Sequence, residues 1–150
     1  MDFSIRKAKD ADIKTLVDLM GLFYAEADYP LEGKWAMESF RFLLAHPSLG
    51  CVWIAQEGRI DAGYVVMTHR YGMEHGGLIA YIDDLFVKKE FRQRHAASML
   101  LEALFKECKA MGCKSVAVEA GSGNHAALGL YDRFGLRQES ATRILLQVQM

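Results

Sequence analysis

Two aspartates stand side by side inside an apolar stretch of the sequence. Asp83 and Asp84 interrupt residues 78–87, LIAYIDDLFV, whose other members are aliphatic or aromatic. Burying an unpaired carboxylate costs free energy, so two of them in an apolar strand need an explanation. A carboxylate can take a proton from a reacting group or bind a cation. The sequence therefore places a candidate acid–base group near the middle of the chain.

A basic turn follows this stretch. Residues 92–97 read RQRHAA, and apolar residues at helical spacing begin at Ala96. The first turn of a helix presents unpaired backbone N–H groups and the positive end of the helix dipole, which favour an anion such as phosphate. Arg92 and Arg94 add guanidinium groups suited to bidentate phosphate contacts. A solvated basic turn without a ligand is the alternative, and neither GxxxxGK[ST] nor GxGxxG is present.

A third pattern lies near the C-terminus. In the segment NHAALGLYDRFGL, Asn124, Ala127, Tyr131 and Gly135 stand at offsets 0, 3, 7 and 11. Together with the apolar strand and the RQRHAA turn, this segment resembles the GNAT superfamily of N-acetyltransferases. The family has a strand ending in an apolar-x-Val, an [RQ]xxGx[GA] turn and an NxxAxxLYxxxGF segment.

The resemblance implies a site for acetyl-CoA as cosubstrate. The pyrophosphate would bind the backbone amides of Arg92, Gln93, Arg94, His95, Ala96 and Ala97. The pantetheine arm would pair like an extra strand with Leu85, Phe86 and Val87. Asn124 would orient the cofactor or a bridging water, and Tyr131 would approach its sulfur. The sequence departs from the family at His95, where glycine is usual, and at Leu136, where phenylalanine is usual.

Acetyl transfer to an amine needs a base, a stabilised oxyanion and a proton for the thiolate. Tyr131 is the predicted acid, with a core tyrosine as the alternative interpretation. Strict alternation along a strand would put Asp83 and Asp84 on opposite faces. Asp83 then shares the parity of Leu85 and Val87, so we predict it as the base, directly or through a water. A structural hydrogen bond, or binding of the acceptor cation, is the alternative for Asp83.

The amine acceptor is predicted to meet acidic and aromatic groups, which attract cations. The candidates from the first helices and the central strand are Tyr24, Glu26, Asp28, Tyr29 and Asp84. The five histidines are scattered and the three cysteines lack CxxC spacing, so no metal site is predicted.

The elements that position these residues follow a βααβββαβαβ order. Strands are predicted at residues 3–8, 51–56, 60–69, 78–87, 114–120 and 143–148. Helices are predicted from Asp10 to Tyr24 and at residues 35–44, 96–111 and 124–134. The fold class is α/β, with a central mixed sheet and about four helices on both faces, as in the GNAT-like acyl-CoA N-acyltransferase fold. The strands at 78–87 and 114–120 are predicted to be parallel neighbours.

Composition narrows the class of protein. With 150 residues, 51% of them hydrophobic, we predict a single GNAT-type N-acetyltransferase domain over 1–150. The net charge of -1 predicts no nucleic-acid partner, and the lack of a long apolar run predicts no membrane span and a cytoplasmic location. The family resemblance implies a possible homodimer through RILLQVQM, residues 143–150.

Three functions fit these patterns. The first is an acetyl-CoA-dependent N-acetyltransferase in which a primary amine of a small molecule or peptide attacks the thioester directly. The second is a non-catalytic acyl-CoA-binding or sensing module with a degenerate pyrophosphate turn at His95. The third is an interaction domain whose RQRH turn binds nothing, which the Asn124–Tyr131–Gly135 spacing disfavours.

Overall fold

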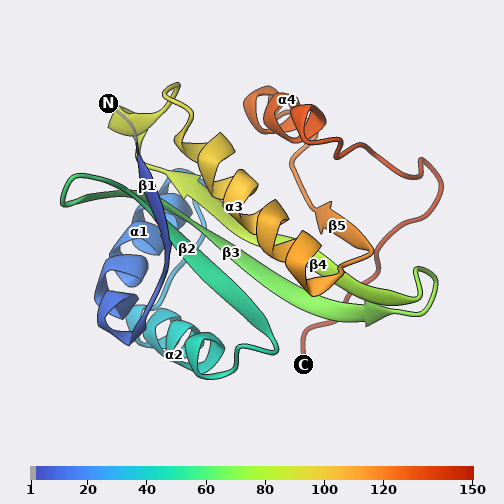
Figure 1. The fold of residues 1–150 in the computed structure, drawn as a ribbon, viewed down its shortest axis with the longest axis horizontal. Coiled ribbons are helices and arrows are strands. Elements are labelled where there is room, and N and C mark those ends of the chain that lie inside the picture. Colours follow the sequence, from blue (N-terminus) through green and yellow to red (C-terminus); the bar gives the residue numbers. More distant parts are fainter. Residues whose placement is uncertain (1–2) are drawn as a thin grey trace. The chain divides into compact units, whose positions relative to one another are not determined.

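The computed structural model describes residues 3–150, which form two compact units. The first unit ends at Glu119 and the second runs from Ala120 to Met150. In the first unit, helices pack around one mixed sheet (Figure 1). Its elements are β1 (Ser4–Lys7), η1 (Asp10–Asp12), α1 (Ile13–Glu26), α2 (Gly33–Ala45), β2 (Gly50–Glu57), β3 (Ile60–Gly72), β4 (Gly77–Val87), η2 (Lys89–Phe91), α3 (Ala96–Met111) and β5 (Ser115–Val118).

The five strands of this sheet lie in the order β1-β2-β3-β4-β5. Strands β1 to β4 pair antiparallel with their neighbours, and β4 pairs parallel with β5. The parallel pair is connected through α3, since a parallel connection needs a crossover of this kind. The predicted mixed sheet and the predicted parallel neighbours are both confirmed.

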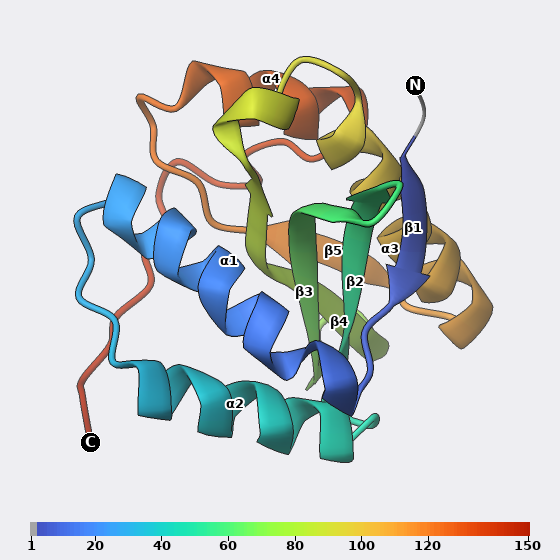
Figure 2. The same ribbon diagram turned by 90° about the vertical axis from the view of Figure 1, so that its left-hand side faces the viewer.

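Helices α1 and α2 cover one face of the sheet (Figure 2). Apolar residues recur at helical spacing on α1, and Leu16 and Leu19 are almost fully buried. Phe40 of α2 joins them over the side chains of Tyr64 and Phe86, which come from β3 and β4. This core holds the face of the sheet on which the candidate site lies.

Helix α3 covers the opposite face of the sheet. Its buried leucines, Leu100, Leu101 and Leu104, follow the helical spacing that predicted this helix. Further along, the Sγ atom of Cys108 lies 3.5 Å from the Sδ atom of Met67 on β3. The helices of the first unit therefore lie on both faces, as predicted.

Strand β4 changes its neighbours half-way along its length. From Ile79 to Ile82 it pairs with β3 on one side and with β5 on the other. Beyond Ile82 the pairing with β5 stops, while the pairing with β3 continues to Val87. The second half of β4 therefore has one edge from which β5 has separated.

The second unit contains α4 (His125–Arg133). Asn124 caps this helix, because its Oδ1 accepts a hydrogen bond from the backbone N–H of Ala127 at 3.2 Å. Gly135 follows the helix with a φ of 83°, in the left-handed region that glycine tolerates.

The predicted strand at residues 143–148 is wrong. These residues form no strand or helix, and the large apolar side chains of Ile144, Leu145, Leu146 and Val148 are 74–81% exposed. A strand needs a partner for its backbone N–H and C=O groups, and this segment pairs with no strand of the described chain. Its composition is typical of a strand, but composition supplies no partner.

Between residues 3 and 150, no helix combines the length and the apolar character needed to cross a membrane.

Candidate functional site

A β-bulge in β4 carries the two aspartates. In the register with β3, Asp84 pairs with Val66 and Ile82 pairs with the next residue, Met67. Asp83 lies between them as an extra residue without a partner, which interrupts the alternation of side chains. Asp84 consequently lies on the same face as Val66, the face covered by α1 and α2.

The charges of both carboxylates affect the pKa of Tyr24, a half-buried residue of α1. Burial raises the pKa of Tyr24 to about 12, and the charges of Asp84 and Asp83 contribute to the rise. Asp83 and Asp84 are thus both close enough to Tyr24 to affect its pKa. The bulge interrupts the strict alternation on which the opposite-face prediction depends, and the direction of Asp83 stays a prediction.

Asp84 is half-buried and has one strong neighbour. Its Oδ2 accepts a hydrogen bond of 2.9 Å from the hydroxyl of Tyr64. Burial raises the pKa of Asp84 to about 6, the Tyr64 hydrogen bond opposes this, and the adjacent Asp83 adds to it. Among residues 3–150 no lysine or arginine forms an ion pair with Asp84. This carboxylate is thus ionised above about pH 6 and has no cation of its own.

Asp83 is more exposed than Asp84. Its pKa is raised by partial burial and then by the charge of Glu119, which directly follows β5. Asp83, Asp84 and Glu119 gather negative charge at the end of the paired part of β4 and β5. An ammonium group is the ligand that this charge favours.

The other predicted acceptor residues lie at the end of α1 and in the loop that follows it. Glu26, at the end of α1, is bound to Arg92. Asp28 adopts a left-handed backbone with a φ of 57°, and Tyr29 is 67% exposed in the loop before α2. Tyr24 lies near Asp83 and Asp84, and the ring of Tyr29 lies 6.2 Å from the ring of Tyr24, centre to centre.

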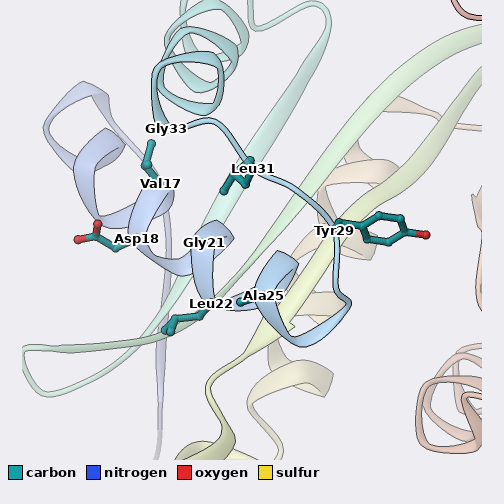
Figure 3. Close-up of a pocket in the computed structure, with 8 residues that line it drawn as sticks. All are labelled: Val17, Asp18, Gly21, Leu22, Ala25, Tyr29, Leu31 and Gly33. Atoms are coloured by element: carbon teal, nitrogen blue, oxygen red, sulfur yellow. The ribbon is translucent and has the colours of Figure 1, made fainter.

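A shallow groove of about 600 Å³ lies along α1 and the loop that follows it (Figure 3). It includes Tyr29, whose ring points away from the helix in Figure 3, and neither aspartate of the bulge. The lining residues are Val17, Asp18, Gly21, Leu22, Ala25, Tyr29, Leu31 and Gly33. This groove is therefore separate from the candidate acid–base group.

The open edge of β4 exposes backbone groups. The N–H of Lys88 donates to the carbonyl oxygen of Ala62 on β3. Hydrogen-bonding direction alternates along a strand, so the N–H and C=O groups of Leu85 and Val87 point the other way, toward the separated edge. Arg92 Nε already donates to the carbonyl oxygen of Val87 at 2.8 Å. Both groups of Leu85 and the N–H of Val87 remain for an amide-containing ligand.

Arg92 joins the end of α1 to the end of β4. Its Nη2 donates to both carboxylate oxygens of Glu26, at 2.8 and 2.7 Å, while its Nε holds Val87. The guanidinium also lies 5.6 Å from the ring centre of Phe86, whose side chain is buried in the α1 core. Arg92 is therefore engaged by the protein on three sides.

Arg94 is paired in the same way. Its guanidinium forms an ion pair with Glu57 at the end of β2. It lies over the rings of Phe3 and Phe91, with its Cζ 5.0 and 5.8 Å from their centres. Both arginines that were predicted to attract phosphate thus have a glutamate partner. The backbone of the turn is left as its main anion-binding feature.

The backbone of the turn has an unusual shape. Gln93 has a φ of 60°, and His95, the residue that caps α3, has a φ of 70° and a ψ of 9°. This left-handed region favours glycine, and another residue there costs about 1–2 kcal/mol. His95 therefore holds the conformation that the glycine of the family motif would adopt. Left-handed residues among right-handed ones turn successive N–H groups toward one point, which is an anion-binding arrangement.

These features would suit two parts of a CoA molecule, the pyrophosphate and the pantetheine arm. The turn leads into α3, a helix of 16 residues, whose first N–H groups suit a pyrophosphate. The open edge of β4 suits an amide-rich arm. Ala96 is buried at the start of α3, and Ala97 follows it in the first turn.

Asn124 and Tyr131 belong to the second unit. The side chain of Asn124 is used to cap α4, which gives this residue a structural role of its own. Tyr131 is buried, and burial raises the pKa of its hydroxyl. Their roles toward a cofactor stay predictions.

Two residues near the aspartates were missed by sequence reasoning. Tyr64 lies on β3, and Glu119 follows β5. A tyrosine inside AGYVVM and a glutamate at the end of a short apolar strand are the only signals, and both patterns are common. Tyr64 and Asp84 are 20 residues apart, so their contact depends on a strand register that includes a bulge.

Comparison with known proteins decides the family. Residues 14–136 match the acetyltransferase (GNAT) family. The chain belongs to this family. GNAT proteins use acetyl-CoA.

Solved structures support the GNAT fold. An integron cassette protein from the mobile metagenome of Cole Harbour Salt Marsh is 34% identical, covering 97% of this chain and 90% of its own, with a TM-score of 0.86. The protein AAC(6')-Iy, solved in complex with the bisubstrate analog CoA-S-monomethyl-acetylneamine, is 16% identical. Its match covers 100% of this chain and 99% of its own, with a TM-score of 0.85. At that identity, AAC(6')-Iy shows a shared fold alone.

A curated relative of this GNAT protein is glucosamine 6-phosphate N-acetyltransferase from Arabidopsis thaliana. It is 28% identical over 83 residues, which cover 55% of this chain. The match spans 54% of the relative, about half its length. Family and fold are therefore established for this GNAT protein, and its acceptor is a matter for proposal.

Proposed function

We propose that this GNAT protein is an acetyl-CoA-dependent N-acetyltransferase acting on a primary amine of a small cationic molecule or peptide. One observation carries the proposal: Asp84 is a half-buried carboxylate without a cation, and it lies on β4 beside the open edge. In a GNAT fold, that is a place where an amine and a thioester can meet.

Asp84 replaces Asp83 as the proposed base. An acceptor ammonium has a pKa of about 10 and must lose a proton before it attacks a carbonyl carbon. Asp84 has a pKa of about 6, so it is ionised at neutral pH and can take this proton, directly or through a water. Asp83, with more exposure, is proposed to attract the acceptor's charge together with Glu119.

The remaining roles follow the family motif. The bound cosubstrate supplies an activated acetyl thioester. The N–H of Val87 is proposed to donate to the thioester carbonyl oxygen. Tyr131 is proposed to give its hydroxyl proton to the departing thiolate, and burial keeps that proton on the hydroxyl at neutral pH. Asn124 is proposed to orient the cofactor through groups not used in its cap.

Two measurements test the proposal. Calorimetry with acetyl-CoA should show binding, and no binding at millimolar concentration contradicts it. A thiol-release assay should then cover polyamines, aminoglycosides, amino sugar phosphates, amino acids and peptide amines. Binding without turnover across the panel would favour a non-catalytic acyl-CoA-binding module. Tyr131→Phe keeps the ring and should slow turnover; an unchanged rate would remove Tyr131 from the role of acid.

We also propose a homodimer in which a second copy covers the C-terminal apolar residues. The segment from Ile144 to Met150 exposes five large apolar side chains, and its composition suits a strand. Strand β5 is an edge of the described sheet and could receive such a strand. Light scattering should give twice the monomer mass, and Leu146→Lys should lower it; a monomeric native chain contradicts the dimer. A cytoplasmic location stays a prediction.

A further inference from the structure

Tyr64 is a fully buried tyrosine with an aromatic environment. It lies on β3 with 0% of its surface exposed, on the face covered by α1 and α2. Phe40 of α2 meets its ring edge-on at a centroid distance of 6.1 Å, and Phe86 lies at 6.5 Å. A phenylalanine would satisfy this packing equally well, so the packing does not account for the hydroxyl.

The hydrogen bond from the Tyr64 hydroxyl to Asp84 accounts for a tyrosine at this position. A buried hydroxyl without a partner is costly, and this one donates to Asp84 Oδ2 at 2.9 Å. The donor is fixed by a rigid ring inside the core, whereas the acceptor follows the unpaired residue of a bulge. The contact therefore joins the residue next to the bulge to a fully buried side chain of the core.

We propose that Tyr64 is a positioning residue that fixes one oxygen of Asp84, so that Oδ1 faces the acceptor amine. This inference rests on the proposed function, in which Asp84 is the base. Asp84 Oδ1 accepts no hydrogen bond from residues 3–150, which leaves it available to a ligand. With Oδ2 held, the carboxylate loses rotation about its last bond, and its free oxygen keeps one direction.

The same hydrogen bond lowers the pKa of Asp84 against the larger effect of burial. The groups that face it are Asp83 on β4, Tyr64 on β3 and Tyr24 on α1. Burial and Asp83 favour the protonated acid, while the Tyr64 hydroxyl stabilises the ionised form. Tyr24 and Tyr64 both have pKa values raised by burial, so both stay neutral in the pH range in which Asp84 changes charge. Removing the Tyr64 hydroxyl should therefore raise the pKa of Asp84.

The test is Tyr64→Phe, which keeps the ring in the core. The pKa of Asp84 is measured by NMR titration of ¹³C-labelled aspartate carboxyls, assigned with Asp84→Asn. It should rise by on the order of one pH unit, and the acidic limb of kcat/KM against pH should rise equally. Phe40→Leu is the matched control, because it loosens the same packing without touching the hydroxyl. It should lower the unfolding temperature and leave both pH curves in place.

The outcomes separate this inference from the proposed function. An unchanged Asp84 titration in Tyr64→Phe overturns the positioning role, even in an active enzyme. An equal shift in Phe40→Leu overturns it as well, because packing would then be the cause. Absence of turnover in the native chain contradicts the proposed function, and the titration still decides whether Tyr64 controls Asp84.

Discussion

The turn before α3 and the bulge in β4 each contain two like charges within three residues, but the protein treats them differently. Arg92 and Arg94 each have a glutamate partner. Asp83 and Asp84 have no ion-pair partner among residues 3–150. Paired charges hold the fold together, whereas unpaired ones are available to a ligand. The comparison teaches that charge in a sequence indicates a binding site only after its internal partners are known.

The two regions also differ in what they can offer a ligand. At the turn, the guanidinium groups are occupied, so backbone N–H groups directed by left-handed residues are the remaining attraction for an anion. At the bulge, Asp84 Oδ2 is held by Tyr64, and the remaining carboxylate oxygens are the groups that could meet a ligand. We therefore expect side-chain substitutions to have large effects at the bulge and small effects at the turn.

The largest effect should come from Asp84→Asn. Removing the proposed base should lower kcat/KM on the order of a hundredfold or more at pH 7.5. Asp83→Asn is the matched control, since it removes the neighbouring charge from the same bulge. We expect it to lower kcat/KM less than about tenfold, chiefly through KM. Equal losses would show that the two carboxylates act as one unit.

Asp84→Asn should lower activity but raise the free energy of unfolding. The pKa of Asp84 is raised in the folded protein, to about 6 from 3.8, so the folded state binds more protons than the unfolded state between these values. The ionised Asp84 therefore lowers the free energy of unfolding little below pH 4, and its destabilising effect is largest above pH 6. At pH 8 the asparagine variant should be more stable by about 1–3 kcal/mol, and at pH 4 the two proteins should be alike.

Urea unfolding at both pH values measures this difference. A variant that is less stable at pH 8 would mean that Asp84 is satisfied by contacts of its own. The contrast between aspartates without ion pairs at the bulge and arginines with ion pairs at the turn would then not hold for Asp84.

The arginines provide the converse test. Arg94→Ala should weaken acetyl-CoA binding by less than about fivefold, because its charge is already held by Glu57. Glu57→Gln removes the negative charge beside Arg94 and keeps the arginine, so it should strengthen binding slightly in low salt. Calorimetry at two salt concentrations measures both. A loss of tenfold or more in Arg94→Ala would show that the ion pair opens for the ligand.

The smallest effect on binding should come from His95→Gly. His95 already has the left-handed backbone of a glycine, so the affinity for acetyl-CoA should stay within about threefold. The substitution should still stabilise the fold by about 1 kcal/mol, because glycine adopts this conformation without strain. His95→Ala is the control that keeps the strain and loses the imidazole. A large loss of affinity in both variants would show that the imidazole binds the ligand.

Much of the fold could be predicted because most helices and strands have a recognisable pattern in their own residues. The spacing of Leu100, Leu101 and Leu104 marks α3, and Gly112, with a φ of 72°, ends it. The parallel pairing of β4 with β5 follows from a helix between two strands. The prediction of a strand at 143–148 was wrong because β-pairing depends on distant residues, and a strand-like composition does not guarantee a neighbouring strand.

The candidate site was predicted in part, down to the two aspartates and the turn. The bulge at Asp83 was not predicted, since a bulge is a feature of two strands together and leaves no mark in the sequence of one of them. Glu26 and Glu57 lie 66 and 37 residues from the arginines that they bind, so no local pattern reveals these pairs. The choice of Asp84 as base rests on burial and on Tyr64, which both come from the packing.

The sequence by itself determined the family, the order of elements as far as α4 and the residues that could do chemistry, because spacing and residue type are local properties. The tertiary structure decided which charges are free, which carboxylate is half-buried and which backbone groups lie at an open edge. These depend on contacts between distant segments. In the sequence, Arg92 and Arg94 look as available to a ligand as Asp83 and Asp84. In the folded chain the two arginines form ion pairs with glutamates, whereas the two aspartates form the candidate reaction site.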